Sequence, residues 1–177
     1  RSPLMPNETL KLQLERARFE RALEIAESIA EHHHQLSTAE LARMNNILTG
    51  KKEDVDPWRT GPVTLQLPSG RTETLAIVAD PKTAAREKLH LAAEIYETGD
   101  AIAAAVRIYV ELVLAHVFED ANRRTAVLAA HYYLKKKGLP ASGLALHEMT
   151  VGDLRDADQV ALLRAGIEKI CAGVISN

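Results

Sequence analysis

Residues 116–138 read HVFEDANRRTAVLAAHYYLKKKG. A histidine and a phenylalanine come first, an acidic residue follows, and Asn122, Arg123 and Arg124 then precede an apolar run that ends at a glycine. The run predicts a buried helix over about 122–137, because glycine commonly follows the last turn of a helix. Its beginning is unusual, since a helix N-terminus favours acidic side chains and two arginines stand here instead.

An anion bound at this end of the helix would explain the two arginines. The first backbone N–H groups of a helix have no internal partner and carry partial positive charge, and arginine binds phosphate oxygens with two hydrogen bonds. Asp120 offers the carboxylate by which Mg²⁺ is usually held beside phosphates. His116 ends the preceding apolar segment and is a candidate general base. Together these residues indicate a site for phosphoryl transfer.

The same residues also have a simpler, structural interpretation. A histidine at a helix end often has no chemical role, and adjacent arginines are often solvated or paired with nearby acids, here Glu119 and Asp120. The combination of residue types favours the site over this alternative. Phe118 is predicted to turn inward and anchor the loop.

Composition narrows the classes of protein to which the chain can belong. Its 177 residues predict one domain, and the net charge of -2 argues against a general nucleic-acid-binding surface. The single cysteine, Cys171, allows no internal disulfide and predicts a reducing compartment. No apolar run approaches the roughly 20 residues of a membrane span, and the beginning of the chain does not resemble a signal peptide. We therefore expect neither a nucleic-acid nor a membrane partner.

Most of the chain reads as helix. A long amphipathic segment without Gly or Pro is followed by a capping-box pattern from Ser37 to Glu40, which predicts the start of a second helix ending at Gly50. The boundaries of the later helices are predicted from Asp80-Pro81, Gly99-Asp100 and Gly138, which are residue types that begin or end helices. The expected helices cover about 9–34, 38–50, 82–98, 101–116, 122–137 and 153–173.

Residues 63–78 differ from the rest, because apolar and polar side chains alternate on both sides of a Pro-Ser-Gly turn. This pattern predicts a β-hairpin. Its first strand is expected to comprise Val63, Thr64, Leu65, Gln66 and Leu67, and its second to reach Val78. An isolated hairpin is marginally stable, so it must lean on the helices. The expected fold class is therefore mainly α, a helical bundle with one β-hairpin.

The stretch from His116 to Arg124 resembles the signature of Fic/Doc proteins, which is His, any residue, Phe, any residue, Asp or Glu, Gly or Ala, Asn, Gly or Lys, Arg. Residues 58–63 also resemble the segment that leads into the target-binding flap of that family. The similarity covers about residues 35–140. It implies one Fic/Doc domain over 1–177, with 1–35 as an N-terminal helical extension and 36–140 as the core.

The resemblance implies a role for each matching residue. His116 would deprotonate a hydroxyl group of a target protein, and Asp120 would hold Mg²⁺. Asn122 and Arg124 would bind the phosphates of a nucleotide, with Arg123 adding charge to the same cradle. Phe118 would pack into the core.

The resemblance also implies partners. The hairpin, through residues 63–67, would pair with an extended segment of the target protein by strand addition. A bacterial toxin or effector is expected, held off by a separate antitoxin protein. Such a protein acts in the bacterial cytoplasm or is delivered to another cell, and oligomers are compatible with it.

Two departures from the commonest Fic pattern bear on the reaction. Arg123 stands where adenylylating members have glycine, and Val127 stands where they have a second arginine. The run Asn-Arg-Arg-Thr-Ala is closer to Asn-Lys-Arg-Thr-Ala of the Doc branch, in which the nucleotide is reversed and its γ-phosphate meets the histidine. A guanidinium also fills the room that glycine leaves for a phosphate against the backbone.

The first hypothesis is therefore transfer of a phosphoryl group from Mg-ATP to a protein hydroxyl. Fic-type adenylyl transfer is the alternative. The sequence contains no base-specific motif that would identify the nucleotide. A fold retained for binding without catalysis, and hydrolytic removal of a modification, are the two remaining interpretations.

Many Fic proteins carry an inhibitory motif, Ser/Thr-x-x-x-Glu-Gly/Asn. The nearest match is the segment from Glu27 to His32, in which Glu31 takes the place of the glutamate. Glu27 and His32 depart from the motif, and the arginine that such a glutamate would pair with is Val127 here. Glu31 is the candidate inhibitory residue.

Overall fold

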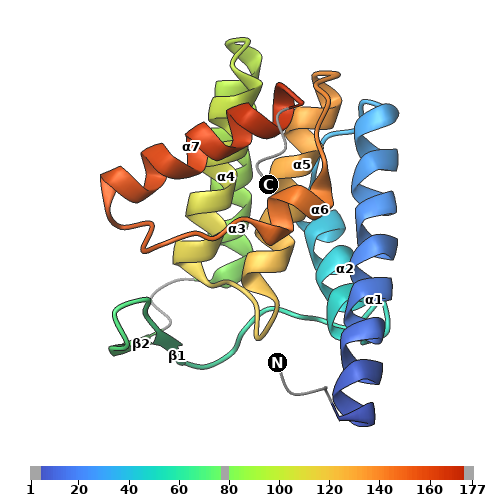
Figure 1. Cartoon of the computed structure of the whole chain (residues 1–177), viewed down its shortest axis with the longest axis vertical. Helices are drawn as coiled ribbons and strands as arrows, with labels where there is room; N and C mark the ends of the chain where they lie inside the picture. Colours follow the sequence, from blue (N-terminus) through green and yellow to red (C-terminus); the bar gives the residue numbers. More distant parts are fainter. Residues whose placement is uncertain (1–4, 77–79, 174–177) are drawn as a thin grey trace.

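A computed structural model describes residues 5–76 and 80–173 of the chain. Within these residues the fold consists of helices and one two-stranded antiparallel sheet, as Figure 1 shows. The expected class, mainly α with one hairpin, is confirmed. The elements are α1 (Pro6–Glu31), α2 (Thr38–Thr49), β1 (Val63–Gln66), β2 (Thr72–Leu75), α3 (Pro81–Glu97), α4 (Ala101–Ala115), α5 (Asn122–Lys136), α6 (Gly143–Glu148) and α7 (Ala157–Cys171).

Helix α5 lies at the centre of the bundle. It packs against α4, α1, α2 and α6, while α4 also contacts α3 and α7. Every residue of α5 from Thr125 to Leu134 is buried, as is typical of a helix surrounded by others. Helix α1 runs along one side of the bundle (Figure 1). The loop that joins α4 to α5 is thus held between the two most central helices.

Local signals placed several helix ends correctly. The Ser37 hydroxyl accepts a hydrogen bond from the Glu40 N–H at 3.2 Å and so caps α2. Gly50 ends that helix in the left-handed conformation, with φ of 73°. Asp80 and Asp100 cap α3 and α4 through their carboxylates.

None of the helices within the described residues has the length and apolar character that a membrane crossing requires.

The hairpin forms as predicted. Val63 pairs with Leu75 and Gln66 with Thr72 across the two strands. Leu67 continues the pairing into the turn, since its N–H donates to the Arg71 carbonyl at 2.8 Å. Val78, the predicted end of the second strand, lies outside the described residues. The hairpin extends from one end of the bundle, and no helix of the described chain packs closely against it (Figure 1).

The C-terminal part differs from the prediction. The last helix begins at Ala157 and not at 153, because the Asp153 carboxylate accepts from the Arg155 N–H and side chain and so stabilises a turn. Asp156 is the cap of α7 instead. The short helix α6, capped by Ser142, was not predicted, because six residues are too few to display a helical periodicity.

Candidate active site

The loop between α4 and α5 carries two residues in the left-handed backbone conformation. His116 ends α4 with φ of 51°, and Ala121 precedes α5 with φ of 59°. Side chains with a Cβ rarely adopt this conformation, and it costs on the order of 1–3 kcal/mol per residue. The surrounding structure must therefore enforce it, as it commonly does at functional sites.

Asn122 supplies part of that enforcement. Its side-chain amide donates to the Phe118 carbonyl and its carbonyl oxygen accepts from the Phe118 N–H, both at 3.0 Å. Asn122 and Phe118 are both buried. The pair of hydrogen bonds closes residues 118–122 into a ring, and His116, just before the ring, and Asp120, within it, line the same cavity. Phosphate binding by Asn122 remains a prediction, because its side chain is engaged in this ring.

Helix α2 braces the same loop from behind. The buried Asn45 side chain donates to the Asp120 carbonyl at 2.8 Å and to the Thr125 hydroxyl at 3.1 Å. Thr125 in turn donates to the Ala121 carbonyl at 2.8 Å. Unsatisfied groups at this depth would cost about 1–3 kcal/mol each, so this network strongly favours one loop conformation.

Residues 57–60 lie alongside the loop as an extended segment. Trp58 forms an antiparallel bridge with Phe118, and their rings stack with centroids 4.7 Å apart. The Thr60 N–H donates to the Glu119 carboxylate at 3.0 Å. The segment that leads into the hairpin is therefore attached directly to the loop that carries His116.

His116 has the electrostatics of a base. Burial lowers the pKa of its imidazole below the ordinary value of 6.5. The Val113 carbonyl and the Asp120 carboxylate act in the opposite direction, whereas the Arg59 guanidinium adds to the lowering. Since the net shift is downward, the ring is neutral at neutral pH and can accept a proton.

The first turn of α5 is open toward ligands. Its N-cap residue is Ala121, which provides no side-chain hydrogen bond, so the first N–H groups of α5 lack a side-chain cap within the described residues. One oxygen of Asp120 accepts the Ala121 N–H at 2.7 Å. Arg124 stands one turn further along, and its guanidinium has no hydrogen-bond partner in the described part of the chain. This end of α5 can hold an anion.

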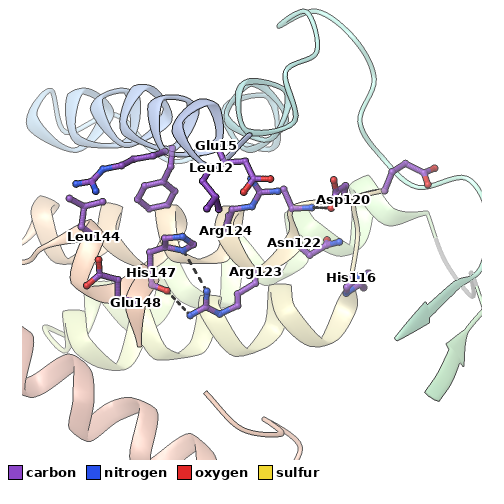
Figure 2. A pocket seen from close by; sticks show the side chains of 14 residues that line it. Leu12, Glu15, His116, Asp120, Asn122, Arg123, Arg124, Leu144, His147 and Glu148 are labelled. Atoms are coloured by element: carbon purple, nitrogen blue, oxygen red, sulfur yellow. Dashed lines mark hydrogen bonds between the residues drawn. The ribbon is translucent and has the colours of Figure 1, made fainter. Parts of the chain in front are cut away.

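A cavity of about 710 Å³ opens in front of this turn. Figure 2 shows His116, Asp120 and Asn122 at one end, Leu144 and Glu148 at the other. Helices α1 and α6 line the rest of the cavity through residues for which no role was predicted: Leu12, Glu15, Arg16, Phe19, Leu144, His147 and Glu148. The sequence carries no signal for them, since they meet α5 only through the packing of distant helices.

The far end of the cavity has an aromatic wall. The Phe19 and His147 rings stack with centroids 4.6 Å apart and an interplanar angle of 23°. Burial, with the neighbouring Arg123 and Arg124, lowers the pKa of His147 below its ordinary value, so its ring is neutral at neutral pH. The uncharged rings of Phe19 and His147 therefore form part of the far wall, which Glu148 also lines, and the anion-attracting α5 turn lies at the other end.

A model of the Fic/DOC family matches residues 35–134, which is more than half of the chain. The chain belongs to the Fic/DOC family. Membership supports, at a general level, a nucleotide-dependent modification of a protein. The comparison with curated proteins found no match.

Solved Fic structures share the fold of this Fic/DOC chain. One is a Fic domain containing signaling protein from Bacteroides thetaiotaomicron, with a TM-score of 0.64 and 16% identity over 93% of this chain and 75% of that one. Another is Fic-1 from C. elegans, with a TM-score of 0.62 and 18% identity over 96% of this chain and 51% of that one. This chain thus spans about half of the second solved chain. At these identities the likeness concerns the fold alone.

Arg123 occupies a different place from the one expected at this Fic signature position. Its guanidinium donates to the backbone carbonyls of His147 and Met149, at 2.9 and 2.7 Å, and so ties α5 to the end of α6. It lines the cavity without filling the space in front of the α5 turn. The expectation that this side chain fills the room left by glycine does not describe its position. Its effect is to fix the wall that carries His147.

Glu31 is not brought together with the other site residues of this Fic chain. It is exposed at the C-terminal end of α1, whereas the cavity is lined from the first half of that helix. At 1.5 Å per residue, the distance along the helix from Glu15 is about 24 Å. Glu27, in the same segment, bonds to the buried His131 at 3.0 Å and so helps to hold α1 on α5. The hairpin residues 63–67 also lie outside the cavity lining.

Proposed function

We propose that the protein transfers the terminal phosphoryl group of ATP to a hydroxyl group of another protein. The observation that carries the proposal is the change along the cavity from the anion-attracting α5 turn beside His116 to the uncharged, stacked Phe19 and His147 rings on α1 and α6. A nucleotide aligned with this gradient places its terminal phosphate, and not its α-phosphate, beside His116.

Charge favours the same alignment. Glu148 lies in the far part of the cavity, where its carboxylate would repel phosphates but accept hydrogen bonds from ribose hydroxyls, while Glu15 lies between the two ends, beside Leu12 and Arg124 (Figure 2). Leu12 and Leu144 offer apolar contact to a base. The N-terminus of α5, together with Arg124, attracts phosphates at the other end.

Asp120 fits a magnesium ion in this arrangement. One of its oxygens is used by the Ala121 N–H, which orients the carboxylate and leaves the second oxygen for a ligand. No group of three or more potential metal-ligating side chains is found in the described residues. A single carboxylate suits Mg²⁺, which is commonly held by one or two carboxylates and by the phosphates of a nucleotide. When bound, the ion neutralises charge on the phosphate oxygens.

The reaction then follows from the position of His116. Its neutral imidazole accepts the proton of the target hydroxyl, and the hydroxyl oxygen forms a bond to the γ-phosphorus. The bond between that phosphorus and the bridging oxygen breaks, and its electron pair leaves with ADP. Arg124 and the α5 N–H groups hold the charged oxygens in place.

A label-transfer experiment tests this function. The purified protein is incubated with Mg²⁺ and bacterial lysate, once with ATP labelled at the γ-phosphate and once with ATP labelled at the α-phosphate. We expect a labelled protein band from the γ-label alone. Label from the α position would establish adenylyl transfer instead, and binding of ATP with no label from either position would indicate a fold that binds without catalysis.

A further inference from the structure

Arg59 is a buried arginine beside the site to which the proposed reaction gives no role. Only 7% of its surface is exposed. Its Nη1 donates to the carbonyls of Gly61 and Leu75, both at 3.2 Å. No ion pair joins it to a carboxylate within the described residues, and its Nε has no partner there. Burying a guanidinium in this way is costly, so its position requires an explanation.

The two carbonyls lie at the open end of the hairpin. Leu75 ends β2 and pairs with Val63, and Gly61 precedes β1 by two residues. Arg59 thus links the segment before β1 to the last residue of β2, at the end of the ladder. Because no helix packs closely against the described hairpin, this bridge is a main determinant of where the hairpin points.

The backbone of the same residue is attached to the His116 loop. The Arg59 N–H donates to the Val117 carbonyl at 3.0 Å, and the Glu119 N–H donates to the Pro57 carbonyl at 3.3 Å. Arg59 therefore pairs with the loop through its main chain and with the hairpin through its side chain. Its charge also acts on His116, on which Asp120 acts in the opposite direction.

We propose that Arg59 is a positioning residue that fixes the hairpin at a set place relative to His116. A target segment paired with the hairpin would then present its hydroxyl at a constant distance from the base. This last consequence rests on the proposed function, whereas the mechanical coupling itself does not.

Arg155 provides a matched control, since its side chain also contacts the hairpin. It pairs with Glu73 on β2, but both side chains are substantially exposed. Exposed pairs contribute about 0–1 kcal/mol, so this contact is expected to matter little. Comparing variants of Arg59 and Arg155 therefore distinguishes the buried Arg59 hydrogen bonds from an exposed contact with the same hairpin.

NMR on the isolated protein tests the coupling without any target. We would record backbone order parameters for Thr64, Leu65, Glu73 and Thr74 and titrate the His116 imidazole in the wild type, Arg59→Gln, Arg59→Lys and Arg155→Gln. In Arg59→Gln we expect the order parameters to fall from the rigid range to below about 0.6. The His116 midpoint should rise toward its ordinary value of about 6.5, because a positive charge is lost.

The remaining variants decide between positioning and general stability. Arg59→Lys should keep the low His116 midpoint yet loosen the hairpin, since the lysine side chain is one bond shorter and its ammonium falls short of the position of Nη1 between the two carbonyls. Arg155→Gln should change neither quantity. An ordered hairpin in a folded Arg59→Gln protein, or in Arg59→Lys if the glutamine variant does not fold, would overturn the inference. An equal fall of the hairpin order parameters in Arg155→Gln would also overturn the inference. None of these outcomes alters the label-transfer result, which reports on the proposed function separately.

Discussion

Replacing His116 with alanine is expected to reduce label transfer by about 10²- to 10⁴-fold, the usual contribution of a positioned general base. The ring is the group at this end of the cavity whose burial keeps it neutral and able to accept a proton. Binding of ATP should change little, because the phosphates are held by the α5 turn and Arg124. Label transfer and equilibrium ATP binding, measured on the same preparation, check both parts.

His90→Ala is the matched control, since His90 is exposed on α3 and away from the cavity. It should show the same label transfer as the wild type.

The pH dependence of label transfer tests the role of His116 a second time. A base must be deprotonated, so the rate should fall as pH drops through a midpoint below the ordinary 6.5, because the His116 pKa is lowered. A folded His116→Ala protein with wild-type transfer would remove His116 from the mechanism.

Replacing Arg124 with alanine is expected to weaken ATP binding by roughly 10- to 100-fold, because a charge-assisted hydrogen bond contributes about 1.5–3 kcal/mol. Arg124 lines the cavity at the first turn of α5, and its guanidinium has no other partner in the described chain. Isothermal titration with Mg-ATP measures the effect. The loss should be smaller for ADP, which has one phosphate fewer to be held.

Arg16→Ala is the control for Arg124, because Arg16 lines the same cavity but already pairs with Glu20 at 3.1 Å. Its removal should change ATP affinity by only a few-fold. Arg123→Ala should behave differently from both. It frees the carbonyls of His147 and Met149 and should lower the melting temperature. Equal ATP affinity in Arg124→Ala and the wild type would contradict the assigned phosphate site.

The fold was largely predictable because its signals are local. The Ser37 cap, the glycine after α2 and the alternation of residues 63–67 each concern a few neighbouring residues, and α2 and the hairpin formed accordingly. Helix α6 has no such signal. Asp153 looked like a helix start, but its carboxylate is used by Arg155. A polar residue before a helical stretch can stabilise a turn or a cap, and sequence alone does not distinguish the two.

The candidate site was predictable only at one end. The residues from His116 to Arg124 are contiguous, so a short pattern contains them all. Phe19 and His147 are far apart in the sequence and meet through the packing of α1 and α6 on α5. Arg123 shows what a closer use of helix geometry could have added. Neighbouring helical residues point about 100° apart, so Arg123 and Arg124 could not both face one phosphate cradle from a regular helix.

The orientation of the nucleotide is the central claim, and intermolecular NOEs test it most directly. The His116→Ala protein, labelled with ¹³C, would be mixed with Mg²⁺ and unlabelled ATP, so that bound nucleotide is not consumed. Cross-peaks from the adenine protons to the Leu12 and Leu144 methyls and the Phe19 ring are the predicted result. They would place the terminal phosphate at the His116 end. Cross-peaks from adenine to hairpin side chains such as Leu65, with none to Phe19 or Leu144, would contradict the account.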